Sequence, residues 1–145
     1  MTSVTKILET FDVNKLLIKE YNNWYLVLRK EQVTLGSLVL IEKSFEKEYS
    51  SIPNESFKEF KFIVKDLELV LKDLFQYDKI NYLMLMMVDT EVHYHIIPRY
   101  SIIKEFNSLK FRDYGWPKMP NLSSCNELSE KEIIKLKEFI KNKFL

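Results

Sequence analysis

A long amphipathic segment occupies the middle of the chain, from about residue 54 to residue 75, and sets the strongest limit on its fold. Apolar side chains recur there at alternating steps of three and four residues, the period of one helix face. Asn54 can cap the first turn, and Glu55 suits the positive end of the helix dipole. The segment predicts a long helix whose buried face consists of Phe57, Phe60, Val64, Leu67, Leu71 and Leu74.

Three shorter apolar runs before this segment predict β-strands. Residues 15–21 and 24–28 are separated by Asn22-Asn23, a pair that favours a tight turn because Asn tolerates positive φ. Residues 37–41 follow Gly36 and are rich in branched aliphatic side chains, as in a buried strand. We therefore expect a hairpin and a third strand ahead of the helix.

Two further strands are expected after the helix, over residues 81–88 and 92–98. Only residues 89–91 separate them, which implies a hairpin or a bulge. Residues 101–124 show no sustained period and predict a long ordered loop. A capping-box pattern at residues 129–132 then opens a C-terminal helix.

Both ends of the chain are expected to be helical. Residues 4–11 are long enough for one or two turns, and the C-terminal helix has an apolar face of Ile133, Leu136, Ile140 and Phe144. The pattern predicts an α+β fold in which an antiparallel sheet of about five strands packs against a long central helix. A chain of 145 residues favours one domain over residues 1–145, with a core at about 16–100 and a C-terminal loop and helix at 101–145.

The composition excludes several classes of partner. The chain carries 22 Lys and Arg against 21 Asp and Glu, so it lacks the basic excess that drives non-specific nucleic-acid binding. The single Cys125 can form neither an internal disulfide nor a cysteine-built zinc site, which favours a reducing, cytoplasmic setting. The N-terminus lacks the apolar core of a signal peptide, and the longest apolar run, residues 82–88, is too short to cross a bilayer. We expect no membrane or specific nucleic-acid partner, and any anion site must be local.

Both histidines of the chain, His93 and His95, fall within one predicted strand. Side chains two residues apart on a strand point to the same side, about 6.5 to 7 Å apart, so Glu91 would extend the two imidazoles into a polar row. Apolar side chains alternate with this row on the opposite face. The residues alone leave three interpretations open: a solvated strand face, a metal site of two histidines and one carboxylate, or a catalytic site.

The segment His93-Tyr-His-Ile-Ile-Pro-Arg99 resembles the signature of the histidine triad family, in which three histidines alternate with apolar residues and Pro-Arg often follows. The match covers the last two histidines, the spacers and the Pro-Arg tail. The order of hairpin, Gly36, strand and long helix is also similar, so the resemblance extends from about Leu16 to Tyr100. A divergent bacterial branch, similar to dinucleoside polyphosphate hydrolases, shares Val88-Asp89 before the motif and Gly115-Trp-Pro117 after it.

Three positions depart from the family pattern. Glu91 stands where the first histidine of the triad is expected. Ser37 replaces the histidine that usually follows the loop glycine. Arg29, by ungapped counting back from Gly36, takes the place of an acidic or amide residue that often contacts ribose. The resemblance therefore leaves the nucleotide specificity open.

The resemblance implies a phosphoester or phosphoanhydride hydrolase, or a nucleotidyl transferase, that forms a nucleotidyl-histidine intermediate on His93. An imidazole attacks only through an unprotonated nitrogen, so its other nitrogen needs an acceptor, either a backbone carbonyl or Glu91. His95 matches the histidine on the leaving-group side, where it can donate a hydrogen bond. The candidate substrate-binding residues are Ser37, Arg29, Asn81, Arg99 and Trp116, with Tyr114 as a second aromatic that can stack on a base.

The resemblance also implies a nucleotide or dinucleotide substrate, no cofactor and a twofold homodimer. Two alternatives to the enzyme remain. One is a non-catalytic nucleotide-binding module, in which loss of the first triad histidine and of the loop histidine accompanied loss of turnover. The other is a metal site formed by Glu91, His93 and His95.

Overall fold

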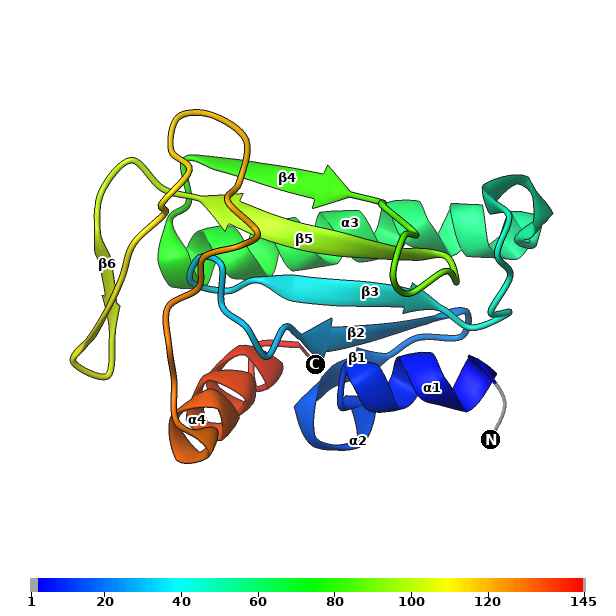
Figure 1. Cartoon of the computed structure of the whole chain (residues 1–145), viewed down its shortest axis with the longest axis horizontal. Coiled ribbons are helices and arrows are strands. Elements are labelled where there is room, and N and C mark those ends of the chain that lie inside the picture. Colours follow the sequence, from blue (N-terminus) through cyan, green and yellow to red (C-terminus); the bar gives the residue numbers. More distant parts are fainter. Residues whose placement is uncertain (1–2, 145) are drawn as a thin grey trace.

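The computed structural model describes residues 3–144, in which five antiparallel strands form the main sheet and helices cover both of its faces (Figure 1). The helices are α1 (Ser3–Thr10), α2 (Val13–Leu16), α3 (Asn54–Phe75) and α4 (Glu130–Lys141), with a 3₁₀ turn η1 (Tyr49–Ser51). The strands are β1 (Leu17–Glu20), β2 (Trp24–Leu28), β3 (Leu38–Glu42), β4 (Lys79–Leu83), β5 (His93–Arg99), β6 (Lys104–Phe106) and β7 (Leu109–Phe111).

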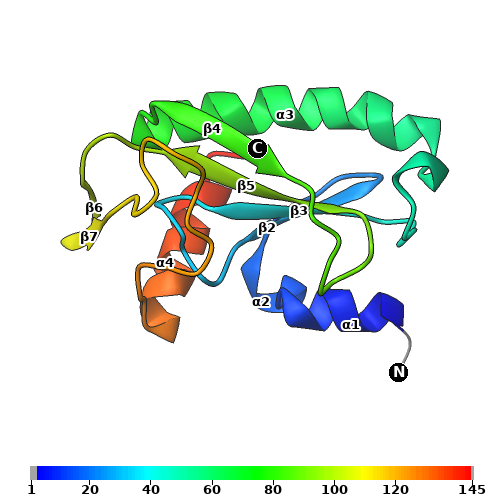
Figure 2. The same ribbon diagram turned by 45° about the horizontal axis from the view of Figure 1, so that its top comes forward.

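The sheet separates the face covered by α3 from the face that carries both histidines. Its strand order is β1-β2-β3-β5-β4, with every neighbouring pair antiparallel. Helix α3 runs along one face, and α1 and α2 lie on the other side of the sheet (Figure 2). Helix α4 packs at the β1 edge, where it also contacts α2 and α3. The α+β fold with a long helix and terminal helices is thus confirmed.

Helix α3 occupies the predicted residues 54–75, but its buried face is slightly rotated from the predicted one. Phe57 is 40% exposed, whereas Ser56 is fully buried. The Ser56 hydroxyl donates to the Glu42 carboxylate at 2.6 Å, and its carbonyl accepts from the Trp24 indole N–H at 2.9 Å. These bonds satisfy polar groups that burial would otherwise penalise. The buried side chains of α3 are Ser56, Ile63, Leu67, Leu71 and Phe75.

The start of α3 differs from the prediction. Asn54 is not the cap: Pro53 is the N-cap residue, and no side chain caps the first turn. Glu55 lies in that turn, as predicted. Although α3 has 22 residues, no helix within residues 3–144 combines the length and apolar character needed to cross a membrane.

The hairpin predicted over residues 15–28 is confirmed as β1 paired with β2, except that residues 15–16 belong to the short helix α2. Strand β4 ends at Leu83, so the predicted strand over residues 81–88 is too long. Met86 has a φ of 50°, which interrupts extended backbone, and Met87 and Val88 are 78% and 95% exposed. Residues 84–92 instead form a loop between β4 and β5.

The C-terminal third contains more regular structure than its sequence indicates. Strands β6 and β7 form a small antiparallel hairpin within the predicted loop 101–124, where three-residue strands are too short to leave a readable period. The capping box at Ser129 and Glu132 is confirmed. The predicted apolar side chains Ile133, Leu136, Ile140 and Phe144 are all buried.

Candidate active site

Strand β5 places both imidazoles on the sheet face opposite α3. The His93 and His95 rings lie edge to face with centroids 5.0 Å apart, and the Phe11 ring lies 5.4 and 6.0 Å from them. Tyr94, between the histidines, points the other way and stacks on Phe60 of α3 at 4.9 Å. The alternation of a strand therefore brings the two histidines together, as predicted.

Glu91 acts on this pair through its backbone rather than its side chain. It lies before β5, where the Val92 N–H donates to the Glu46 carbonyl at 2.9 Å and anchors the approach to the strand. The Glu91 carboxylate is buried and accepts from the Thr90 hydroxyl at 3.2 Å. The Glu91 carbonyl lies 2.6 Å from Nδ1 of His93. The three polar side chains that were predicted to form one row therefore do not lie on one strand, because Glu91 precedes the start of β5.

The contact to the Glu91 carbonyl defines the tautomer of His93. A carbonyl oxygen only accepts hydrogen bonds, so Nδ1 carries the proton and the neutral ring keeps its lone pair on Nε2. The His93 side chain is only 2% exposed, which limits its freedom to turn away. His93 thus has the acceptor and the tautomer that a nucleophilic imidazole needs.

His95 has the opposite tautomer because Arg29 approaches it. Nε of Arg29 lies 3.4 Å from Nδ1 of His95 and can only donate, so Nδ1 accepts and Nε2 carries the proton. Burial lowers the pKa of His95 to about 4, with further contributions from the positive Arg29 and from His93. When both rings are neutral, the site therefore combines a lone pair on Nε2 of His93 with an N–H donor on Nε2 of His95.

Both imidazoles line a cavity of about 390 Å³. Besides β5, four parts of the chain form its walls: the end of α1 with Phe11, the segment after β2, the loop 85–89, and Leu122. A larger hollow of about 570 Å³ lies under α1 and α2 and is lined by Glu9, Asp12, Glu20 and five other residues, none of them histidine. Of these two cavities, the smaller one is therefore the one that both histidines line.

Arg29 is fixed at the cavity by a hydrogen-bond network around Gln32. The fully buried Gln32 amide donates to the carbonyls of Arg29 and Ser37 at 2.6 and 3.0 Å and accepts from the N–H groups of Gly36 and Ser37. Asn126 binds the Gln32 carbonyl through its N–H at 2.8 Å and through its amide at 3.1 Å. Hydrogen bonds from the Gln32 amide and from Asn126 therefore hold the backbone segment that carries Arg29. Nothing in the sequence distinguishes Gln32 or Asn126 from ordinary loop residues.

Ser37 does not line the cavity. Its hydroxyl is fully buried, donates to the Thr34 carbonyl at 2.8 Å and accepts from the Thr34 N–H at 3.0 Å. Gly36 precedes it with a φ of +85°, and a Cβ there would lie 3.0 Å from the Phe75 ring. Ser37 and Gly36 thus shape the turn into β3 within this structure.

Three other candidate residues also lie outside the cavity. Arg99, at the far end of β5 from His93, pairs with both oxygens of Asp113 at 2.7 and 3.1 Å and donates to Asn81 at 2.8 Å. Trp116 lies in the loop that follows Asp113. Its companion Tyr114 is 54% exposed and does not line the cavity either. The structure therefore joins the half-buried Asn81 to the buried pair of Arg99 and Asp113, away from the cavity.

The structure does not favour the metal alternative. Within residues 3–144, no three or more His, Cys, Asp or Glu side chains are arranged to hold a metal ion, and Glu91, His93 and His95 form no such group. The sequence prediction also misses several cavity residues, namely Phe11, Lys30, Leu122 and the loop 85–88. The motif gives no signal for them because they come from distant parts of the chain.

Comparison with known proteins gives matches at the level of structure. No model of a protein family matches the sequence, and no curated protein gives a significant match. A histidine triad protein from Marinobacter aquaeolei is 20% identical, with a TM-score of 0.73 and coverage of 94% of this chain and 93% of that chain. A hypothetical histidine triad nucleotide-binding protein from Sulfolobus tokodaii is 20% identical, with a TM-score of 0.67 and coverage of 99% and 91%.

A third match is a diadenosine triphosphate hydrolase from Plasmodium falciparum, 13% identical, with a TM-score of 0.64 and coverage of 97% of this chain and 95% of that chain. All three alignments extend over nearly the whole chain, well beyond the segment that carries His93 and His95. The chain therefore has the fold of the histidine triad proteins.

Proposed function

We propose that this protein is a hydrolase or nucleotidyl transferase that acts on nucleoside phosphates, with His93 as the nucleophile. The observation that carries the proposal is the 2.6 Å contact between Nδ1 of His93 and the Glu91 carbonyl, which leaves Nε2 as a lone-pair donor at the cavity. The fold supports it, since one protein of the same fold is a diadenosine triphosphate hydrolase and another is described as nucleotide-binding.

The proposed first step is attack of the His93 Nε2 lone pair on a phosphorus atom of the substrate. A P–Nε2 bond forms, the bond from phosphorus to the leaving group breaks, and the leaving group departs with the bonding electrons. His93 keeps its Nδ1 proton, so the nucleotidyl-imidazolium carries a positive charge beside the Glu91 carbonyl. In the second step water attacks the same phosphorus and the P–Nε2 electrons return to the ring, which releases a nucleotide and a proton.

His95 assists as a hydrogen-bond donor rather than as an acid. A neutral imidazole that gave up its Nε2 proton would become an imidazolate, so His95 stabilises developing negative charge by donating an N–H bond. The best leaving groups are then those that depart as stable anions, such as phosphates. The route uses no cofactor.

The test is turnover of labelled dinucleoside polyphosphates and AMP conjugates by the wild type and the His93→Asn variant, with and without chelator. We expect His93→Asn to lose at least about a thousandfold in rate. Glu91→Gln is the matched control, because it changes the adjacent side chain but keeps the carbonyl, and it should retain most of the activity. Label trapped on the wild-type protein by acid denaturation is not expected on His93→Asn.

Each other outcome identifies a different function. Turnover that survives His93→Asn would contradict the nucleophile. Binding of nucleotides without turnover by the wild type would favour the non-catalytic binding module, and loss of activity on chelation would favour a metal site.

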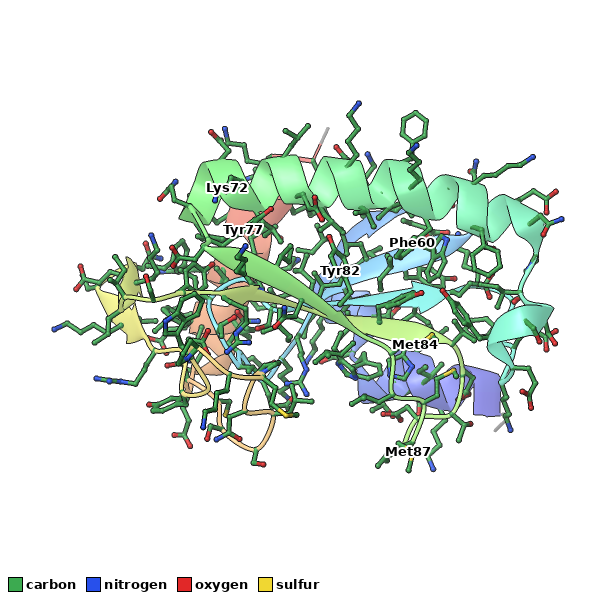
Figure 3. The ribbon with its side chains drawn as sticks, turned by 90° about the horizontal axis from the view of Figure 1, so that it is seen from above. Phe60, Lys72, Tyr77, Tyr82, Met84 and Met87 are labelled. Carbon is green, nitrogen blue, oxygen red and sulfur yellow. The ribbon has the colours of Figure 1, made fainter. Side chains whose placement is uncertain are left out.

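We also propose that the protein forms a homodimer through the β4 edge of the sheet. Within residues 3–144, β4 has no strand on its outer side, and Tyr82 and Met84 lie along this edge (Figure 3). Exposed apolar side chains of Leu85, Met87 and Val88 follow. An open, partly apolar edge favours pairing with another strand. Light scattering should give twice the chain mass of 17.5 kDa, and a monomer at micromolar concentration would contradict the dimer.

A further inference from the structure

The outer side of helix α3 carries an exposed line of alternating lysine and apolar side chains. At successive steps of four, three, four and three residues lie Lys58, Phe62, Lys65, Leu69 and Lys72, which we call the α3 ridge. Residues three and four apart are neighbours on a helix surface, so the ridge is continuous. Phe62 is 79% exposed and Leu69 66%, and no other element within residues 3–144 lies over this side of α3 (Figure 2).

The lysines of the α3 ridge have no carboxylate partner. No ion pair within residues 3–144 includes Lys58, Lys65 or Lys72. Lys72 donates instead to the Tyr77 carbonyl and lies over the Tyr77 ring (Figure 3). The ridge therefore presents positive charge on both sides of its two apolar side chains.

The carboxylates next to the ridge are already bound within the protein. They are Glu59, Asp66 and Asp73, seven residues apart on the adjoining side of α3. Their partners come from the β1–β2 turn and the C-terminal segment: Glu59 accepts from the N–H groups of Asn22 and Asn23 at 3.1 and 2.7 Å, Asp66 accepts from the Tyr21 hydroxyl at 2.9 Å, and Asp73 lies 3.1 Å from Nζ of Lys143. These carboxylates are thus held in contacts that point away from the lysines of the ridge.

Two hollows flank Phe62. One, of about 470 Å³, is lined by Lys58 and the β1–β2 turn, and the other, of about 380 Å³, is lined by Lys65 and Leu69. Phe62 and Tyr21 border both hollows. A projecting aromatic ring between hollows suits a protein partner, whose own side chains fill such spaces around an anchor residue.

We infer that the α3 ridge is a docking surface for an acidic amphipathic helix of a partner protein. Steps of four and three match the repeat of a second helix that lies along α3. Its apolar side chains would pack on Phe62 and Leu69, and its Asp or Glu side chains would face the lysines. The inference goes beyond the proposed function and is independent of it, because α3 covers the face of the sheet opposite His93 and His95.

Two other occupants match the α3 ridge less closely. A second copy of this chain docked through the same ridge would place lysines beside lysines, and like charges across an interface repel. A lipid surface favours a broad apolar helix face opposite a polar one, whereas Lys65 lies between Phe62 and Leu69 on the same line. An acidic helix uses both the charged and the apolar members of the ridge.

The test is binding of the full chain to synthetic helical peptides of about 20 residues, measured by fluorescence anisotropy. One peptide alternates Leu and Glu along one face at steps of three and four. A second carries Lys in place of each of these Glu residues, and a third has the composition of the first in shuffled order. We expect the Glu peptide to bind about tenfold or more tightly than either of the others.

Two changes to the ridge separate its charged and apolar contributions. The double variant Lys58→Glu, Lys65→Glu should reverse the preference, so that the Lys peptide binds more tightly than the Glu peptide. Phe62→Ser should weaken binding of the Glu peptide about tenfold.

Each change has a matched control elsewhere on the surface. Lys131→Glu with Lys135→Glu makes the same charge change at exposed positions of α4, and Ile102→Ser removes an apolar side chain that is 65% exposed. Both controls should bind the Glu peptide as the wild type does. Circular dichroism of each variant checks that the fold is intact.

Equal binding of the Glu and Lys peptides, failure of the Glu peptide to bind, or a preference unchanged by the Lys58 and Lys65 reversal would overturn the inference. Binding to phosphatidylserine vesicles without binding of the Glu peptide would replace the protein partner by a lipid surface. Self-association that Phe62→Ser abolishes, again without peptide binding, would replace it by a second copy of this chain.

Discussion

His95 should make the stability of this fold sensitive to mild acid. Burial, Arg29 and His93 lower its pKa from 6.5 to about 4. Between these values the unfolded chain binds a proton that the folded protein rejects, so the free energy of unfolding falls as the pH drops through the window. Below about pH 4 both states are protonated and the loss is complete.

The magnitude follows from the width of that window. At about 1.4 kcal/mol per pH unit, the interval from 6.5 to about 4 corresponds to at most about 3.5 kcal/mol. The imidazole borders the cavity, where solvent screens part of the effect, so we expect about 1 to 3 kcal/mol. The charged groups on the same cavity are Arg29, Lys30, Glu31 and Asp89.

The assay is urea unfolding of the wild type and of His95→Gln at pH 7 and at about pH 4.5. The glutamine side chain does not titrate, so the wild type should lose about 1 to 3 kcal/mol more than the variant on acidification. Carboxylates with a lowered pKa, such as Asp78, Glu130 and Glu138, lose stabilising contacts equally in both proteins and cancel in the comparison. Equal losses in the two proteins would refute the reasoning about His95.

Two further predictions follow from buried contacts. Asp113→Ala leaves Arg99 buried without its carboxylate and should lower the free energy of unfolding in urea by about 3 to 5 kcal/mol, while turnover per folded molecule stays the same. A decrease of less than about 1 kcal/mol would contradict a structural role for this pair. Phe11→Ala exposes the imidazoles and should raise the pKa of His95 above about 4 in an NMR titration. An unchanged pKa would mean that the Phe11 ring does not contribute to the burial of His95.

The sequence predicts best those elements in which apolar residues recur over many positions or in which a clear turn marks the ends. Helix α3 spans 22 residues, enough turns for its apolar stripe to stand out, and the Asn22-Asn23 turn separates β1 from β2. The two histidines share a face because strand alternation is local and needs no knowledge of the rest of the molecule.

The candidate site is less predictable because its key contacts join distant residues. Arg29 reaches His95 across 66 positions, a contact that depends on the order and register of β2, β3 and β5. The partner of Arg99, Asp113, comes from a region without readable periodicity, so sequence alone does not separate a structural arginine from a substrate-binding one. Whether the side chain or the carbonyl of Glu91 orients His93 depends on where β5 begins.

The bonds from Asn126 to the Gln32 backbone have a consequence for fragment design. The motif and the five strands of the main sheet all lie within residues 16–100, which makes this region look like a natural minimal unit. A fragment cut there would keep His93 and His95 but lose Asn126, whose hydrogen bonds to Gln32 hold the segment that carries Arg29. Such a truncated protein would retain both histidines but lose the contacts that hold the segment carrying Arg29, so removing the C-terminal third would change the wall of the cavity.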